Sequence, residues 1–107
     1  MNEYILVLTT VPEEKAAQNL ARALIQDRLA ACVTVSADSV SFYRWEGSVH
    51  EDSERVLFIK TRTDLFTDLE RRIKALHPYK VPEIIALPIV RGASEYLDWV
   101  ASETRSR

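Results

Sequence analysis

Three side chains of this sequence could bind a transition metal or act as nucleophiles: Cys32, His50 and His77. No two of them lie within four residues of each other, and no CxxC, HxxxH or HExxH pattern occurs. His50 stands in an acidic segment that predicts an exposed position. Cys32 follows three apolar residues, where a free cysteine is usually a small hydrophobic residue that reacts slowly. Each is therefore a metal candidate by residue type alone.

His77 has a structural explanation beside the chemical one. It follows an amphipathic segment and precedes Pro78, which disfavours helical geometry at the residue before it. A histidine in the last turn of a helix is also favoured by the helix dipole. The sequence therefore predicts that His77 ends a helix, and metal binding would be an additional role.

Composition argues against several functional classes. The net charge of -2, the pI of about 5.7 and the scattered basic residues give no surface for nucleic acid or anionic membranes. Two glycines are too few for a phosphate-binding loop, and no nucleophile stands in a pattern with a base. We therefore expect no enzymatic activity. A single cysteine excludes an intrachain disulfide and favours a cytoplasmic location.

The elements that position these residues follow from hydrophobic periodicity. A continuous apolar run predicts a central strand buried on both faces, and spacings of three and four predict helices. The order is β-α-β-β-α-β with a short C-terminal helix, so the sequence predicts one α+β domain over 1–107, a ferredoxin-like sandwich with an extended hairpin. The expected segments are strand 4–8, helix 12–28, a strand region 32–45 with apolar runs at 32–35 and 40–45, return strand 54–61, helix 65–76, strand 84–90 and helix 94–102.

Apolar residues occupy both faces of the predicted hairpin. Phe42 alternates with Tyr43 and Trp45, and the return strand alternates in the same way, while two helices can cover only one face. Monomers rarely expose a large apolar patch, so we expect the open face to pack on another copy of the chain. The alternative is that the C-terminal helix folds across it. Pro88 should either place the last strand at an edge of the sheet or break it with a bulge.

Several long segments resemble the CutA family of divalent-cation tolerance proteins over nearly the whole chain. They are LHPYKVPEIIALPI, RLAACVTV, FYRWEGSVHEDSERVLFIKT and YLDWV. The resemblance implies a ferredoxin-like fold, a homotrimer, and an architecture similar to that of PII signalling proteins. It also implies that the hairpin residues Phe42, Tyr43 and Trp45 reach the neighbouring subunit and form the trimer interface.

The resemblance implies a role in the response to metal ions, with copper or another divalent cation as a weak, non-obligatory ligand. Copper-binding members use a cysteine on the first strand and a His-His pair before Pro-Tyr. This sequence has Thr9 at the first position and Leu76-His77 at the second, so only His77 carries over. One histidine is too few for a copper site, which weakens this interpretation. Cys32 and His77 remain the metal candidates.

The resemblance to PII proteins implies an alternative function as a small-molecule sensor or adaptor. Its site would lie between subunits and use Glu54, Lys60, Tyr79 and Glu83, which stand beside apolar strand segments. Partly buried charges must be paired, so the same residues could instead form salt bridges between subunits. The sequence leaves both interpretations open.

Overall fold

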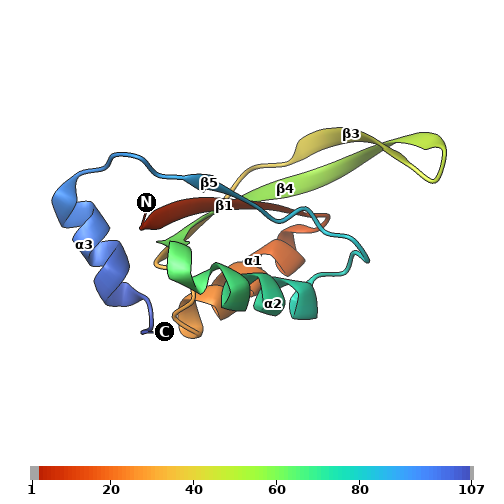
Figure 1. The fold of residues 1–107 in the computed structure, drawn as a ribbon. Helices are drawn as coiled ribbons and strands as arrows, with labels where there is room; N and C mark the ends of the chain where they lie inside the picture. Colours follow the sequence, from red (N-terminus) through yellow and green to blue (C-terminus); the bar gives the residue numbers. More distant parts are fainter. Residues whose placement is uncertain (1–2, 107) are drawn as a thin grey trace.

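Five antiparallel strands and three α-helices form the domain in the computed structural model, which describes residues 3–106 (Figure 1). Residues 1, 2 and 107 of the predicted 1–107 domain lie outside the described residues. In chain order the elements are β1 (Tyr4–Val11), α1 (Glu14–Gln26), β2 (Cys32–Val35), β3 (Ser39–Trp45), β4 (Ser48–Arg62), the 3₁₀ turn η1 (Thr63–Leu65), α2 (Phe66–Leu76), β5 (Ile85–Pro88) and α3 (Ser94–Glu103).

The strands lie in the order β2-β4-β1-β5, and β3 pairs with the first half of the long β4. The predicted α+β class is confirmed, but the predicted order β-α-β-β-α-β has one strand too few, because the region 32–45 contains two strands. It is divided at residues 36–38 into β2 and β3, and β4 starts at Ser48 rather than Glu54. Ser36 causes the break: its backbone N–H donates to the carbonyl of Val56 at 2.9 Å, and its Oγ accepts from the N–H of Val56 at 2.8 Å. Side-chain bonds of this kind compete with a regular ladder.

Both α1 and α2 cover one face of the sheet, as Figure 1 shows below the strands. Their buried residues recur at helical spacing and pack against alternate residues of β1 and β4. The two helices and the sheet therefore share one hydrophobic core. The core on this face includes Val7, Val11, Leu20, Leu24, Leu57, Ile59, Leu69 and Ile73.

The opposite face of the sheet has no helix over it in residues 3–106, which confirms the prediction of an open face. Leu6, Leu8, Val56 and Phe58 point to this side and are half-buried, so the prediction that the first strand is buried on both faces is wrong for the single chain. The alternative that α3 covers this face is also wrong. Helix α3 lies at one end of the sheet (Figure 1), where the guanidinium of Arg62 donates to the Thr104 hydroxyl at 2.9 Å.

The hairpin β3–β4 projects beyond the helices (Figure 1) and turns at Glu46-Gly47. Both turn residues have positive φ, 49° and 82°, as a tight two-residue hairpin requires, so the predicted turn is confirmed. Among the strands of the described residues, β5 pairs only with β1, and it is confirmed as an edge. Its four residues are exposed, however, so its apolar run is not buried by this chain. No helix within the described residues is long and apolar enough to span a membrane.

Candidate functional site

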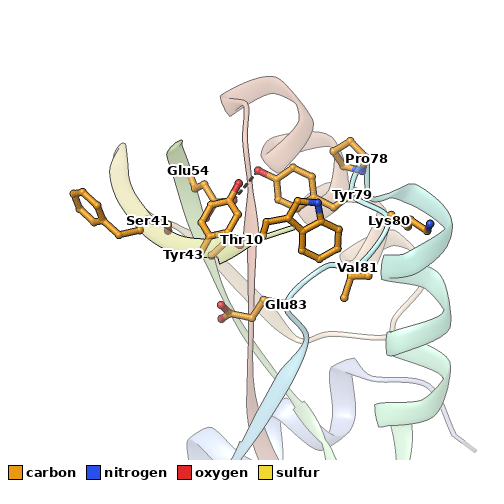
Figure 2. Close-up of a pocket in the computed structure, with 11 residues that line it drawn as sticks. Thr10, Ser41, Tyr43, Glu54, Pro78, Tyr79, Lys80, Val81 and Glu83 are labelled. Atoms are coloured by element: carbon orange, nitrogen blue, oxygen red, sulfur yellow. Dashed lines mark hydrogen bonds between the residues drawn. The ribbon is translucent and has the colours of Figure 1, made fainter. Parts of the chain in front are cut away.

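A cleft of about 600 Å³ opens where the projecting hairpin meets the segment between α2 and β5 (Figure 2). This volume is within the usual range for small-molecule sites. Three parts of the fold contribute: the end of β1, the facing strands of the hairpin, and residues 78–83. The lining residues are Thr10, Ser41, Phe42, Tyr43, Trp45, Glu54, Pro78, Tyr79, Lys80, Val81 and Glu83.

His77 fixes the segment that forms one wall of the cleft. It is the C-cap of α2, with extended φ and ψ of -82° and 138°, so its predicted role as a helix end is confirmed. Its Nδ1 accepts the backbone N–H of Tyr79 at 3.0 Å, and its Nε2 lies 2.6 Å from the carbonyl oxygen of Thr10. A carbonyl can only accept, so the ring is neutral with its proton on Nε2. This buried imidazole therefore ties the wall to β1 and orients Tyr79.

Glu54 and Tyr79 form the polar centre of the cleft. Glu54 is only 5% exposed, and its Oε2 accepts the Tyr79 hydroxyl at 2.7 Å, a contact drawn in Figure 2. Burial, and secondarily the hydrogen bond and negative charge of Glu54, raise the pKa of Tyr79 well above its usual value near 10. The phenol therefore stays protonated and acts as a donor to the carboxylate.

A second tyrosine–carboxylate pair lies beside the first on the hairpin. Tyr43 donates to Oδ2 of Asp52, and its ring stacks on His50 with centroids 5.5 Å apart. The hydrogen bond to Asp52 is the main cause of a raised Tyr43 pKa. Asp52 and Glu54 are two residues apart on β4 and so face the same side as Tyr43. The cleft is thus lined by phenols that donate to carboxylates.

The structure brings three of the four predicted pocket residues together. Glu54, Tyr79 and Glu83 line one cleft, whereas Lys60 does not. Lys60 is six residues from Glu54 on β4, roughly 20 Å along the strand. It lies opposite Cys32 in the register, with its ammonium 3.9 Å from the Cys32 sulfur. A single chain therefore does not place Lys60 in the site.

The predicted metal candidates are not assembled into one site by the chain. No group of three or more His, Cys, Asp or Glu side chains within residues 3–106 could hold a metal ion. Cys32 is half-buried at the level of Leu6 on β1, and His77 contacts Thr10, roughly 13 Å farther along that strand. Both ring nitrogens of His77 are already hydrogen-bonded, so a metal would have to displace one of those contacts.

Thr9 occupies the position at which copper-binding relatives are expected to carry a cysteine. Its side chain is fully buried on the helix-covered face, and its hydroxyl has no hydrogen-bond partner among the described residues. A buried hydroxyl without a partner is costly, and it offers a transition metal a poor ligand. The structure therefore gives Thr9 no evident role in the cleft.

The hairpin residues predicted at a trimer interface are all exposed in the single chain. The exposed fractions are 67% for Phe42, 39% for Tyr43 and 44% for Trp45. All three also line the cleft, a role that the sequence analysis missed together with those of Thr10 and Lys80. The register pairs Tyr43 with His50 and puts Tyr43 on the same face of the hairpin as Asp52 and Glu54, which could not be read from the sequence before β3 and β4 were paired.

Comparison with known proteins identifies relatives over almost the whole chain. A family model described as CutA1 divalent ion tolerance protein matches residues 5–103. The divalent-cation tolerance protein CutA of Thermus thermophilus is 54% identical over 99 residues, 92% of this chain and 96% of that protein. The chloroplastic CutA of Arabidopsis thaliana is 46% identical over 95% of this chain but only 56% of its own length.

Solved structures agree with the sequence comparison. The divalent cation tolerance protein from Thermus thermophilus superposes with a TM-score of 0.93 and 52% identity, over 95% of this chain and 99% of that chain. A structure from Archaeoglobus fulgidus, described as a periplasmic divalent cation tolerance protein, gives a TM-score of 0.91 and 35% identity over 94% and 97% of the two chains. The family suggested by the sequence segments is therefore confirmed. The chain belongs to the CutA family of divalent-cation tolerance proteins.

Proposed function

We propose that this protein is a non-enzymatic binding protein of the response to divalent cations, and that the cleft around Glu54 is its ligand site. Membership of the CutA family supports the first part. The second part rests on one observation: Glu54, which is only 5% exposed, lines a cleft of about 600 Å³ and accepts a hydrogen bond from the Tyr79 hydroxyl there. Convergent polar groups in such a cleft are typical of a binding site.

Binding rather than catalysis suits the chemistry of the cleft. The raised pKa of Tyr79 keeps its hydroxyl protonated, so it donates a hydrogen bond and is a poor base. The cleft is lined by neither a cysteine nor a histidine. Its serine and threonine, Ser41 and Thr10, would need an adjacent base to act as nucleophiles.

The proposed functional form is a homotrimer in the cytoplasm. Support for assembly comes from the uncovered sheet face and from the exposed apolar edge formed by Ile85 and Leu87, at 49% and 43%. Large exposed apolar patches usually mark an interface. In this arrangement a neighbouring copy would close the cleft and complete a site between subunits, as in the PII-like alternative. The location follows from cysteine usage alone, and relatives named chloroplastic and periplasmic show that the family is not confined to one compartment.

A weak site for copper or another divalent cation is the second candidate function. The observation in its favour is that Cys32 is partly exposed on the open face, so that symmetric copies of one thiol could converge in a trimer. His77 would contribute only by giving up its contact with Thr10 or with Tyr79. We therefore expect any metal binding through His77 to be weak.

Thermal unfolding in the presence of a ligand panel tests the proposed site. The panel contains divalent metals, nucleotides and organic amines, because any ligand selective for the folded state raises its melting temperature. At least one should stabilise the wild type and lose its effect in Glu54→Gln, which removes the charge but keeps the shape. Glu51→Gln is the matched control, since Glu51 is exposed on the other face of the hairpin. A panel without any Glu54-dependent ligand would refute the proposal.

A further inference from the structure

We propose that the cleft binds a small organic cation, a primary ammonium or guanidinium group on an apolar stem, and not a nucleotide or another anion. This inference rests on the proposed function, because it names the ligand class for the same site. Three features of the cleft favour such a ligand: a buried carboxylate without a counter-charge among the described residues, the aromatic lining, and the sign of the surrounding charges.

Glu54 is a buried carboxylate whose charge has no partner within residues 3–106. It is 5% exposed, and no lysine, arginine or histidine of the described chain lies within salt-bridge distance of it. Among the described residues its carboxylate receives one side-chain donor, the Tyr79 hydroxyl, although a carboxylate can accept about four hydrogen bonds. Buried charges in proteins are normally paired. The Glu54 carboxylate can therefore accept further hydrogen bonds from a cation that is not part of the described chain.

Aromatic rings line the same cleft as this carboxylate. Tyr43, Trp45 and Tyr79 all line the cleft, and Figure 2 shows the Tyr79 hydroxyl directed at Glu54 with Tyr43 beside it in this view. Faces of aromatic rings attract organic cations, most strongly when the site is shielded from water. A carboxylate then adds a charge-assisted hydrogen bond that fixes the position of the N–H group. Rings and carboxylate together match an ammonium or guanidinium group with a short apolar stem.

The charges of the cleft disfavour an anionic ligand. Two carboxylates, Glu54 and Glu83, line it against one ammonium, Lys80, and Asp52 adds a third carboxylate through its contact with Tyr43. Lys80 is exposed and extends away from Glu54 in Figure 2. A phosphate placed beside Glu54 would be repelled by the carboxylates. The cleft also lacks glycine, so no backbone cradle for phosphate is available there.

A bare divalent ion fits the cleft less well than an organic cation. Hard cations require several oxygen ligands, and copper requires several nitrogen or sulfur ligands. The described residues provide no group of three such side chains. Aromatic walls would also leave most coordination positions of a metal ion unfilled.

A lysine from another copy of the chain could supply the same ammonium chemistry. Lys60 is half-buried on the open face of the sheet, and within residues 3–106 it has no carboxylate partner. In an assembled protein this side chain could reach the cleft of a neighbour. The proposed occupant of the cleft is the free ligand, and Lys60→Met separates it from this second source of an ammonium group.

Calorimetric titration of the assembled protein tests the inference, with n-butylammonium chloride and agmatine as cationic probes. Sodium butyrate and ATP are the anionic probes, and sodium chloride corrects for ionic strength. Both amines should bind saturably, with an affinity that falls at least about tenfold in Glu54→Gln and stays within about twofold of wild type in Glu51→Gln. Butyrate and ATP should show no Glu54-dependent binding.

Each other outcome overturns the inference in a distinguishable way. Glu54-dependent binding of ATP or butyrate without amine binding would refute the ligand class but leave the proposed site intact. Amine binding that appears only in Lys60→Met would show that a lysine of another copy fills the cleft. Absence of Glu54-dependent binding by any probe would refute both the inference and the proposed function.

A spectroscopic readout covers the case in which Glu54→Gln does not fold. The chain has two tryptophans, and Trp99→Phe leaves Trp45, a residue of the cleft, as the only indole. Butylammonium should produce a saturable change in Trp45 emission that an equal concentration of sodium chloride does not produce. An emission spectrum that stays unchanged throughout the amine titration would overturn the inference.

Discussion

Replacing Tyr79 with phenylalanine removes the one side-chain donor that the described residues offer to the Glu54 carboxylate. The ring and its packing are retained, so the substitution isolates the 2.7 Å hydrogen bond. A hydrogen bond to a charged group contributes about 1.5–3 kcal/mol. Glu54 is almost fully buried, but Tyr79 is only half-buried, so water can replace part of the lost contact. We therefore expect a loss near the lower limit, about 1.5 kcal/mol at pH 7.

Equilibrium urea unfolding followed by circular dichroism measures this loss. With an m-value of about 2 kcal/mol/M, the midpoint should fall by about 0.7 M. All variants should be compared at one protein concentration, because assembly makes apparent stability concentration-dependent. Tyr43→Phe is the matched control. It removes the same atom from an exposed hydrogen bond to Asp52, and its midpoint should move less.

The hydrogen bond between Tyr79 and Glu54 also predicts how stability depends on pH. Because the pKa of Tyr79 is higher in the folded protein than its unfolded value near 10, the folded state holds the proton more tightly. The stabilisation is fully present below pH 10 and is lost as the pH rises through the folded pKa. The advantage of the wild type over Tyr79→Phe should therefore be constant between pH 7 and pH 10 and shrink above it. An unchanged midpoint in Tyr79→Phe at pH 7, or an equal loss in Tyr43→Phe, would refute the reasoning.

Three further predictions concern assembly, metal and the thiol. Light scattering at micromolar concentration should give about three times the 12.3 kDa chain mass, and Trp45→Asp should lower it by burying an unpaired charge; a wild-type mass near 12.3 kDa would contradict the trimer. Calorimetry should show that Cu(II) and Zn(II) bind weakly and that His77→Ala reduces the binding, whereas sub-micromolar binding in that variant would exclude His77. Iodoacetamide should modify Cys32 more slowly in the native protein than in the unfolded chain. If assembly covers the open face, the native Trp45→Asp variant should react faster than the native wild type. Equal rates in all three samples would show that the thiol is accessible throughout.

Hydrophobic periodicity was sufficient to predict the helices and most of the strands of this fold. Both helical stripes, the central β1, the edge strand with Pro88 and the turn at Gly47 are local patterns, and each is found where the sequence indicates it. The division of the strand 32–45 could not be predicted in this way. It depends on hydrogen bonds between Ser36 and Val56, twenty residues apart, and such contacts exist only once β4 has paired.

By itself the sequence determined the family and the helix end at His77, and it indicated three residues of the cleft, Glu54, Tyr79 and Glu83. Residue types and long family segments are local properties, so they can be read without the fold. Tertiary structure alone decided which of those residues meet. The register of β3 on β4 puts Tyr43 on the same face as Asp52 and Glu54 and within hydrogen-bond reach of Asp52. The imidazole of His77 holds the backbone of Tyr79, whose hydroxyl donates to Glu54. The same strand carries Lys60 roughly 20 Å from Glu54, and Lys60 is not among the residues that line the cleft.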